Sequence, residues 1–312
     1  MFQTQCAANI NVKKNFSTNK IIKEMSQGKN VFYKDKIFEN ELDFTSLKNT
    51  FCDAENSLKH EVNSSITFIN CTFKANVTAF LQDENKMRHF VIFSKNITFL
   101  NCRFEGKVNF RNTKVNGLVN FSGCEFDKKA SFENMYCGDM AMFQKCIFYD
   151  ELRFQNAIFA NNCNFMDTQF EGVSSFQQAV FRQDAQFGVT KFLKYADFSG
   201  ITANSHLFFN YAEFTKQAIF NNAAFRGRAE FMNCQFKHYA EFKRSVFYGQ
   251  TRFVKSNFSD VVLLDESRFL LGRPDFQKAI IANNSDTLLL APTGSGKTLG
   301  FLLPILQLLK AD

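Results

Sequence analysis

Phenylalanine recurs along this chain at alternating gaps of five and six residues, an 11-residue period that runs from Phe99 to Phe269. Of the 32 positions on this ladder, 28 are Phe. A period of this length, kept over so many residues, indicates one small structural unit stacked many times. The sequence therefore predicts a repeat array and not a mixed globular core.

An 11-residue hydrophobic period is also typical of a right-handed coiled coil. On a helix, which turns about 100° per residue, steps of five and six residues would place successive Phe on different faces. The segments between the Phe are rich in Asn, Thr and Gly, as in 119–126 (VNFSGCEF). A small residue stands two positions before most ladder Phe, and residues two apart in a strand share a face. We therefore expect strands and turns, with both residues facing inward.

The repeating unit is clearest at 141–148 (AMFQKCIF), 218–225 (AIFNNAAF) and 240–247 (AEFKRSVF). These units resemble the pentapeptide-repeat family, in a Phe-centred variant with an 11-residue double unit. The resemblance covers 97–271 and implies an all-β fold, a right-handed quadrilateral β-helix with two units per coil. Such a solenoid would have about eight coils over this range.

The repeats begin before residue 97 but are interrupted. Residues 66–73 (ITFINCTF) nearly duplicate 97–104 (ITFLNCRF) at an offset of 31, one 22-residue coil plus nine. We interpret 82–89 and 53–65 as polar inserted loops, and Phe38 and Phe44 as the ladder of an earlier coil. A helix over 19–27, beginning near Ser17 or Thr18 and ending at Gly28, should cover the open first coil. The expected division is a cap and irregular coil at 1–60, a β-helix at 61–271 with a loop insertion near 79–96, and a different segment at 272–312.

The cysteines follow the same period. Six of the nine stand two residues before a ladder Phe, where other coils have Ala, Ser or Thr: Cys71, Cys102, Cys124, Cys146, Cys163 and Cys234. Cys behaves as a small apolar residue when buried, so we expect core packing in preference to metal or redox chemistry. The first fifteen residues have no apolar signal core, and no apolar run reaches about 18 residues. We expect a reduced, cytoplasmic location without membrane insertion.

Charge is spread thinly along the chain. The formal net charge is +7, from 37 basic and 30 acidic residues. No segment has the basic stripe expected of a protein that binds duplex nucleic acid. None is acidic enough to imitate DNA, a function known among pentapeptide-repeat relatives. The composition therefore favours neither of these two functions for the repeat array.

The period breaks at Gly272, and a different motif follows. An apolar strand is expected at 287–291, then the glycine-rich stretch APTGSGKT at 291–298 and an apolar helix through 310. Strand, glycine-rich loop and helix are the context of a phosphate-binding loop, or Walker A motif. Gly294 and Gly296 would let backbone N–H groups face a phosphate at the helix N-terminus. Lys297 would reach the β- and γ-phosphates, and Thr298 would ligate Mg²⁺.

The residues on both sides of the loop are more specific to one family than the loop alone. Residues 291–306 (APTGSGKTLGFLLPIL) resemble the first ATPase motif of DEAD/DEAH-type helicases, and 273–277 (RPDFQ) resembles their adenine-reading segment. The resemblance implies ATP and Mg²⁺ as cofactors and nucleic acid as a partner of a complete domain. The implied nucleotide contacts are Gln277, Thr293, Gly294, Ser295, Gly296, Lys297 and Thr298, with Thr298 also on the metal.

Only fifteen residues follow Lys297, and they do not include the acidic metal motif, the second domain or an arginine finger. The stretch 261–266 (VVLLDE) imitates the acidic motif, but it precedes the loop and Leu264 is a ladder position. We therefore expect 272–312 to be the truncated start of a helicase domain, without catalytic residues and without nucleic-acid-stimulated ATP hydrolysis.

Two functions remain open at this point. The first is a β-helical scaffold that binds an unidentified protein partner and carries the ATP-binding motif of a DEAD/DEAH-box helicase. The alternative is the N-terminal part of an ATP-dependent helicase, in which the array is a targeting or regulatory extension. Both assign the same residues to nucleotide binding.

Overall fold

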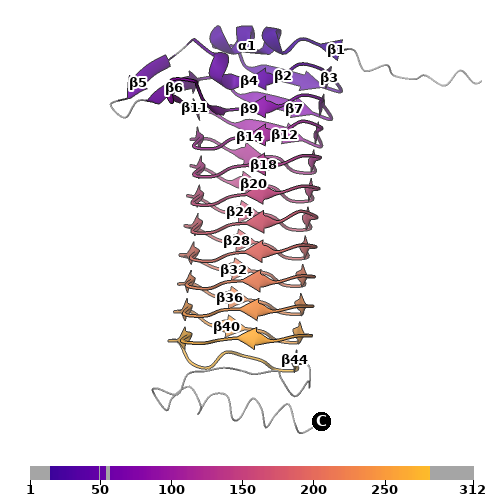
Figure 1. The fold of residues 1–312 in the computed structure, drawn as a ribbon, viewed down its shortest axis with the longest axis vertical. Coiled ribbons are helices and arrows are strands. Elements are labelled where there is room, and N and C mark those ends of the chain that lie inside the picture. Colours follow the sequence, from indigo (N-terminus) through magenta and orange to yellow (C-terminus); the bar gives the residue numbers. More distant parts are fainter. Residues whose placement is uncertain (1–14, 49, 54–56, 282–312) are drawn as a thin grey trace, which may run out of the picture.

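The computed structural model describes residues 15–48, 50–53 and 57–281. They form one all-β solenoid of about nine turns, in which short strands of successive turns lie one above another (Figure 1). Four sheets make up its sides, and the chain visits them in the order B, A, C and D within each coil. The expected all-β solenoid is confirmed.

Sheets A and B meet along one corner of the solenoid. Sheet A contains β1 (Asn15–Phe16), β3 (Ile37–Phe38), β8 (Thr72–Phe73), β13 (Arg103–Phe104), β17 (Glu125–Phe126), β21 (Ile147–Phe148), β25 (Gln169–Phe170), β29 (Lys191–Phe192), β33 (Glu213–Phe214), β37 (Gln235–Phe236), β41 (Asn257–Phe258) and β44 (Ile280–Ile281). Sheet B contains β2 (Val31–Lys34), β7 (Ile66–Ile69), β12 (Ile97–Leu100), β16 (Val119–Asn120), β20 (Ala141–Met142), β24 (Cys163–Asn164), β28 (Ala185–Gln186), β32 (Leu207–Phe208), β36 (Ala229–Glu230) and β40 (Thr251–Arg252).

Sheets C and D complete the coil. Sheet C contains β4 (Leu42–Asp43), β9 (Val77–Thr78), β14 (Val108–Asn109), β18 (Ala130–Ser131), β22 (Leu152–Arg153), β26 (Ser174–Ser175), β30 (Ala196–Asp197), β34 (Ala218–Ile219), β38 (Ala240–Glu241) and β42 (Val262–Leu263). Sheet D contains β5 (Thr50–Asp53), β6 (Ser57–Val62), β10 (Phe80–Gln82), β11 (Arg88–Phe93), β15 (Lys114–Val115), β19 (Tyr136–Cys137), β23 (Ile158–Phe159), β27 (Val180–Phe181), β31 (Thr202–Ala203), β35 (Ala224–Phe225), β39 (Val246–Phe247) and β43 (Arg268–Phe269).

The 22-residue coil fixes the register of the strands. In sheet A, Phe104 pairs with Phe126 and Phe126 with Phe148, each 22 residues later. The backbone N–H of Tyr149 donates to the carbonyl oxygen of Phe126 at 3.0 Å. Because identical positions of successive coils are hydrogen-bonded neighbours, a side chain that faces inward in one coil faces inward in every coil.

The two gap lengths of the ladder correspond to two kinds of corner. The five-residue steps, from sheet B to A and from C to D, turn through a residue with positive φ, such as Gly123 (φ 69°) and Asn134 (φ 55°). Asn and Gly tolerate this left-handed conformation better than other residues. The six-residue steps, as from Phe126 to Phe132, have one more residue in the corner. The alternation in the sequence is therefore the alternation of corners around the coil.

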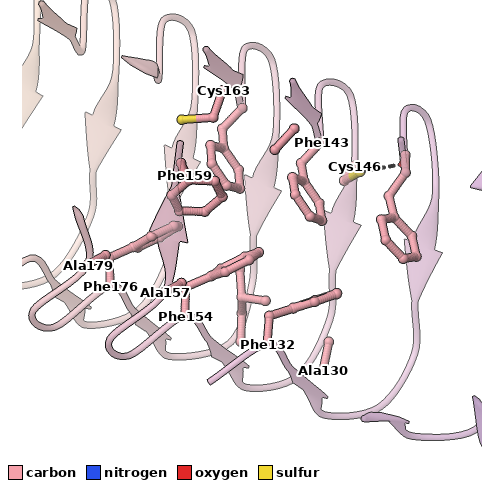
Figure 2. Close-up of a cluster of buried hydrophobic side chains, with 14 of the residues drawn as sticks. Ala130, Phe132, Phe143, Cys146, Phe154, Ala157, Phe159, Cys163, Phe176 and Ala179 are labelled. Carbon is pink, nitrogen blue, oxygen red and sulfur yellow. Dashed lines mark hydrogen bonds between the residues drawn. The ribbon is translucent and has the colours of Figure 1, made fainter. Parts of the chain in front are cut away.

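Phenylalanine rings fill the interior, and the ladder is confirmed as core. Phe143 and Phe165 stack with 5.0 Å between centroids and 5° between planes. Phe143 also meets Phe154 of the opposite wall edge-on, at 5.2 Å and 83°. Figure 2 shows Phe132, Phe154 and Phe176 in such a column. Both geometries are favourable for aromatic pairs.

A single helix covers the first coil, as expected. Helix α1 (Thr18–Ser26) lies across the end of the stack in Figure 1, and Gly28 follows it with a φ of 70°. Ile21 and Met25 are buried against the core. Ser17 stands at the N-cap but makes no capping hydrogen bond through its side chain. The helix hides the open end of the solenoid from water.

The expected loop at 53–65 is wrong in part, because strand β6 lies within this range. The expected loop at 82–89 contains the turn between β10 and β11, together with the adjoining ends of both strands. β5 pairs with β6 and β10 with β11 antiparallel, while β6 and β11 pair with each other in parallel. Together they form the N-terminal end of sheet D, where β5 projects from the stack (Figure 1). The two insertions satisfy their backbone groups by pairing with one another.

The stack continues past the break in the period. β44 pairs with β41, where Asn257 lies opposite Ile280, an offset of 23 residues instead of 22. The ring of Phe276 stacks on Phe253 at 4.7 Å. One additional residue near Gly272, whose φ is 90°, accounts for the shift. Residues 275–281 are therefore part of the solenoid, although the sequence analysis placed them in the helicase-like segment.

Candidate functional site

The predicted nucleotide site is only partly within the described residues. Residues 293–298 lie outside them, so their arrangement stays a prediction. Gln277 is described, and its backbone belongs to the last described coil. Its carbonyl oxygen accepts from the N–H of Lys255 at 2.9 Å, and its own N–H donates to Asp275 Oδ1 at 3.0 Å. The side chain of Gln277 is exposed at the corner between sheets B and A.

The interior of the solenoid offers no reactive group among the described residues. The Cys146 thiol donates to the carbonyl oxygen of Phe121 at 3.0 Å, and Cys124 bonds in the same way to Phe99 at 3.1 Å. Burial raises the pKa of Cys137 and of Cys146 to about 12. A thiol with so high a pKa is a poor nucleophile. The eight described cysteines are all free, and seven of them are buried. The buried cysteines therefore serve as small side chains of the core.

Metal binding has no support in the part of the chain that the structure describes. No group of three or more His, Cys, Asp or Glu side chains there is arranged to hold an ion. Within the same residues, no helix is both long and apolar enough to cross a bilayer.

One cluster of titratable side chains was missed by the sequence analysis. His60 of β6 is 2% exposed, and its ring stacks on that of His89 of β11 with centroids 5.4 Å apart. His60 Nδ1 lies 2.8 Å from the carbonyl oxygen of Leu47, and His60 Nε2 lies 3.2 Å from His89 Nδ1. His89 Nε2 lies 3.4 Å from Asp83 Oδ2. The chain of contacts joins the two hairpins to the η1 turn (Phe44–Ser46).

The geometry assigns the protons in this cluster. The Leu47 carbonyl and the Asp83 carboxylate can only accept, so His60 Nδ1 and His89 Nε2 both carry hydrogen. In the neutral His60 ring, Nε2 is then the acceptor that faces His89 Nδ1. Burial lowers the pKa of His60, the neighbouring His89 adds to this, and the Leu47 bond and the Asp43 charge oppose it. Because the pair joins the two hairpins to the η1 turn, we interpret it as a structural clamp. Nothing in the sequence showed that residues 29 apart would meet, because both lay in presumed loops.

Comparison with known sequences agrees with the geometry of the stack. Residues 91–135 and 139–179 match a family profile described as pentapeptide repeats (9 copies). The solenoid carries pentapeptide repeats. In the structure, the parallel stacking of strands extends beyond the matched residues of the pentapeptide-repeat solenoid, from β3 to β43.

A second profile, described as DEAD/DEAH box helicase, matches residues 275–312. Of these, 275–281 form the last described part of the pentapeptide-repeat solenoid, and the remainder lies outside the described residues. No curated protein and no solved structure matches the chain.

Proposed function

We propose that the pentapeptide-repeat solenoid is a scaffold whose outer faces bind another protein. One observation carries the proposal: inward positions are nearly uniform, whereas outward positions differ from coil to coil. Along sheet B the outward residues are Thr98, Asn120, Met142, Asn164, Gln186, Phe208, Glu230 and Arg252. The fold requires only a small residue and a Phe inside, so the outer faces are free to carry recognition.

The corner between sheets B and A is the strongest candidate for the contact. Met166, Val189 and Tyr211 lie along it in successive coils, exposed by 43%, 46% and 63%. Val189 and Tyr211 both have positive φ, at 59° and 62°. A β-branched residue in this conformation is strained, and strain of this kind is often retained at functional positions. Exposed apolar side chains on a strained corner support binding of an apolar protein surface there.

Site-specific photocrosslinking in the producing cell tests the scaffold proposal. A photoreactive residue at Val189 should give one discrete protein adduct, and the Tyr211→Ser change should reduce its yield. The matched control is the same residue at Asn222, a positive-φ position on the opposite corner. Equal adducts at both positions, or none at Val189, would count against the B–A corner.

A second candidate function is favoured by the match at 275–312. In this proposal 293–298 bind the phosphates of ATP, Lys297 contacts the β- and γ-phosphates, Thr298 ligates Mg²⁺, and Gln277 reads the adenine. Calorimetric titration of the chain with Mg-ATP should then show binding that Lys297→Ala removes. Retained binding in that variant would exclude the assigned loop. Hydrolysis stimulated by nucleic acid is not expected in either protein.

A further inference from the structure

The outer face of sheet C holds a ring of cations around a small residue, next to the hairpin β10–β11. Residues two apart in a strand share a face, and residues 22 apart are stacked neighbours. Ser131 of β18 therefore lies between Asn109 of β14 and Arg153 of β22. Around this centre, a hollow of about 240 Å³ is lined by Lys107, Asn109, Arg111, Lys129, Glu133 and Arg153.

The charges around the hollow do not cancel. Glu133 pairs with Arg111 at 3.1 Å and with Arg153 at 2.9 Å. Glu151 approaches from the edge and pairs with Lys129 at 2.7 Å and with Arg153 at 2.5 Å. Four cations, counting Lys107, against these two carboxylates leave a net charge of +2. Lys107 forms no ion pair within the described ranges. The ring therefore has positive charge that an anion can neutralise.

The walls of the hollow are held in place. Asn109 Nδ2 donates to the carbonyl oxygen of Phe80 at 2.9 Å, and Asn109 Oδ1 accepts from the Arg111 N–H at 3.2 Å. The Arg111 guanidinium lies 5.6 Å from the centroid of the Phe80 ring. The Ser131 hydroxyl makes no hydrogen bond to any other described residue. A fixed wall with a free hydroxyl at its centre is an arrangement suited to a small ligand.

This arrangement does not follow from the repeat itself. Two coils later, Ser175 occupies the same position of sheet C as Ser131. Its flanking residues are Val173 and Gln177, where Ser131 has Lys129 and Glu133. Ser175 shares Arg153 as a stacked neighbour but lacks the flanking lysine and glutamate, so the repeat alone does not produce the ring.

We propose that the hollow over Ser131 binds an oxyanion of the phosphate class. Lys107 and Arg153 would face its charge, and the Ser131 hydroxyl would donate to one of its oxygens. Arginine and lysine are the side chains that hold phosphate by charge-assisted hydrogen bonds. Glu133 occupies the two arginines when no anion is bound, and it competes with the ligand. The ligand can be free phosphate or the phosphate group of a larger small molecule.

Titration of the full chain with orthophosphate, followed by the amide resonances of residues 107–111 and 129–133, tests the site. Saturable shifts are expected, and acetate should give weaker ones. Lys107→Gln should weaken binding about tenfold, as for loss of one charge-assisted bond. Glu133→Gln should strengthen binding, because a competing carboxylate is removed.

Two control variants separate the site from the overall charge. Lys145→Gln and Asp139→Asn make the same charge changes on other corners and should leave the affinity unchanged. Equal effects of Lys145→Gln and Lys107→Gln would overturn the proposal, and so would the absence of saturable shifts. O-phosphoserine provides a second arm: tighter binding than orthophosphate assigns a phosphomonoester as the ligand, and weaker binding assigns the free ion.

Discussion

The ring of Phe214 lies on that of Phe192, with 4.8 Å between centroids and 1° between planes. The two residues are 22 apart, one full coil. Their separation equals the spacing of hydrogen-bonded strands, about 4.8 Å. Backbone bonds and ring stacking therefore share one period, so neither has to deform for the other. Each ring is confined by its own column and by the backbone, and a vacancy in the column cannot easily be closed.

Removal of one inward ring should therefore cost more than removal of its outward neighbour. Phe209 is fully buried, while Phe208 is on the outer face of sheet B and only partly covered. Phe209→Ala should lower the free energy of unfolding by about 3–5 kcal/mol, because a cavity remains. Phe208→Ala should cost less than about 1 kcal/mol. Urea unfolding of the two variants measures the difference, and similar costs would contradict the packing described here.

The strained corner at Val189 should be relieved by a residue suited to positive φ. A β-branched residue there costs about 1–2 kcal/mol. Val189→Asn should therefore raise the free energy of unfolding by roughly 1 kcal/mol, and the reverse change at the opposite corner, Asn222→Val, should lower it by a similar amount. Thermal unfolding of both variants would show shifts of opposite sign. A destabilised Val189→Asn variant would indicate that the side chain of Val189 makes contacts that outweigh the strain.

The His60–His89 clamp should loosen as the pH falls. Since burial lowers the pKa of His60 in the folded chain, the unfolded state binds the proton more readily. The stability from neutral His60 is thus complete above about pH 6.5 and declines below it. Amide exchange in β6 and β11 should become faster between about pH 7.5 and 5, relative to β19 and β23.

The controls for this pH dependence lie in the same chain. His60→Gln should abolish it, while His238→Gln, at an exposed position on another coil, should not. Desolvation opposes ionisation of Asp83, but hydrogen bonds from the Met87 N–H, His89 and the Asn85 N–H lower its pKa overall. Its contribution is therefore lost only below about pH 4, outside this window. Uniform acceleration of exchange along the whole solenoid would rule out a local clamp.

Thiol labelling should separate Cys52 from the core cysteines. Cys52 is exposed, whereas the seven other described cysteines are buried, and burial raises the pKa of Cys137 and Cys146 to about 12. Iodoacetamide should therefore alkylate Cys52 in the native protein and reach the seven only on unfolding. Peptide mass spectrometry after a short pulse measures this. Native labelling of Cys146 at the rate of Cys52 would show that the stack opens locally.

Much of the fold could be predicted because a single residue type, Phe, marks its repeat. The ladder from Phe99 to Phe269 and the small-residue positions follow from side-chain periodicity, and the covering helix follows from the residues at its two ends. The hairpins at 50–62 and 80–93 could not be predicted in this way. They interrupt the 22-residue period, and they are strands because each supplies hydrogen-bond partners to the other.

The last described coil and the cation ring could not be predicted from the sequence, for related reasons. One extra residue near Gly272 breaks the period in the sequence, but the edge of β41 still offers backbone groups that β44 can pair with. Ser131 and its neighbours in the adjacent coils are 22 residues apart. Their proximity is evident only once the coil length and the direction of each side chain are known. Both depend on the register of neighbouring coils.

The sequence by itself determined that Phe side chains are stacked in a long β-solenoid, because burial of an aromatic residue every five or six positions allows few other folds. The tertiary structure alone decided that the stack continues through Ile281, how the two insertions pair, and which outward side chains meet. Inward positions hold the same residue types in every coil, so each one can be predicted from the local sequence. The contacts of an outward side chain depend on neighbours a full coil away. A single-residue shift in register would bring different charges together.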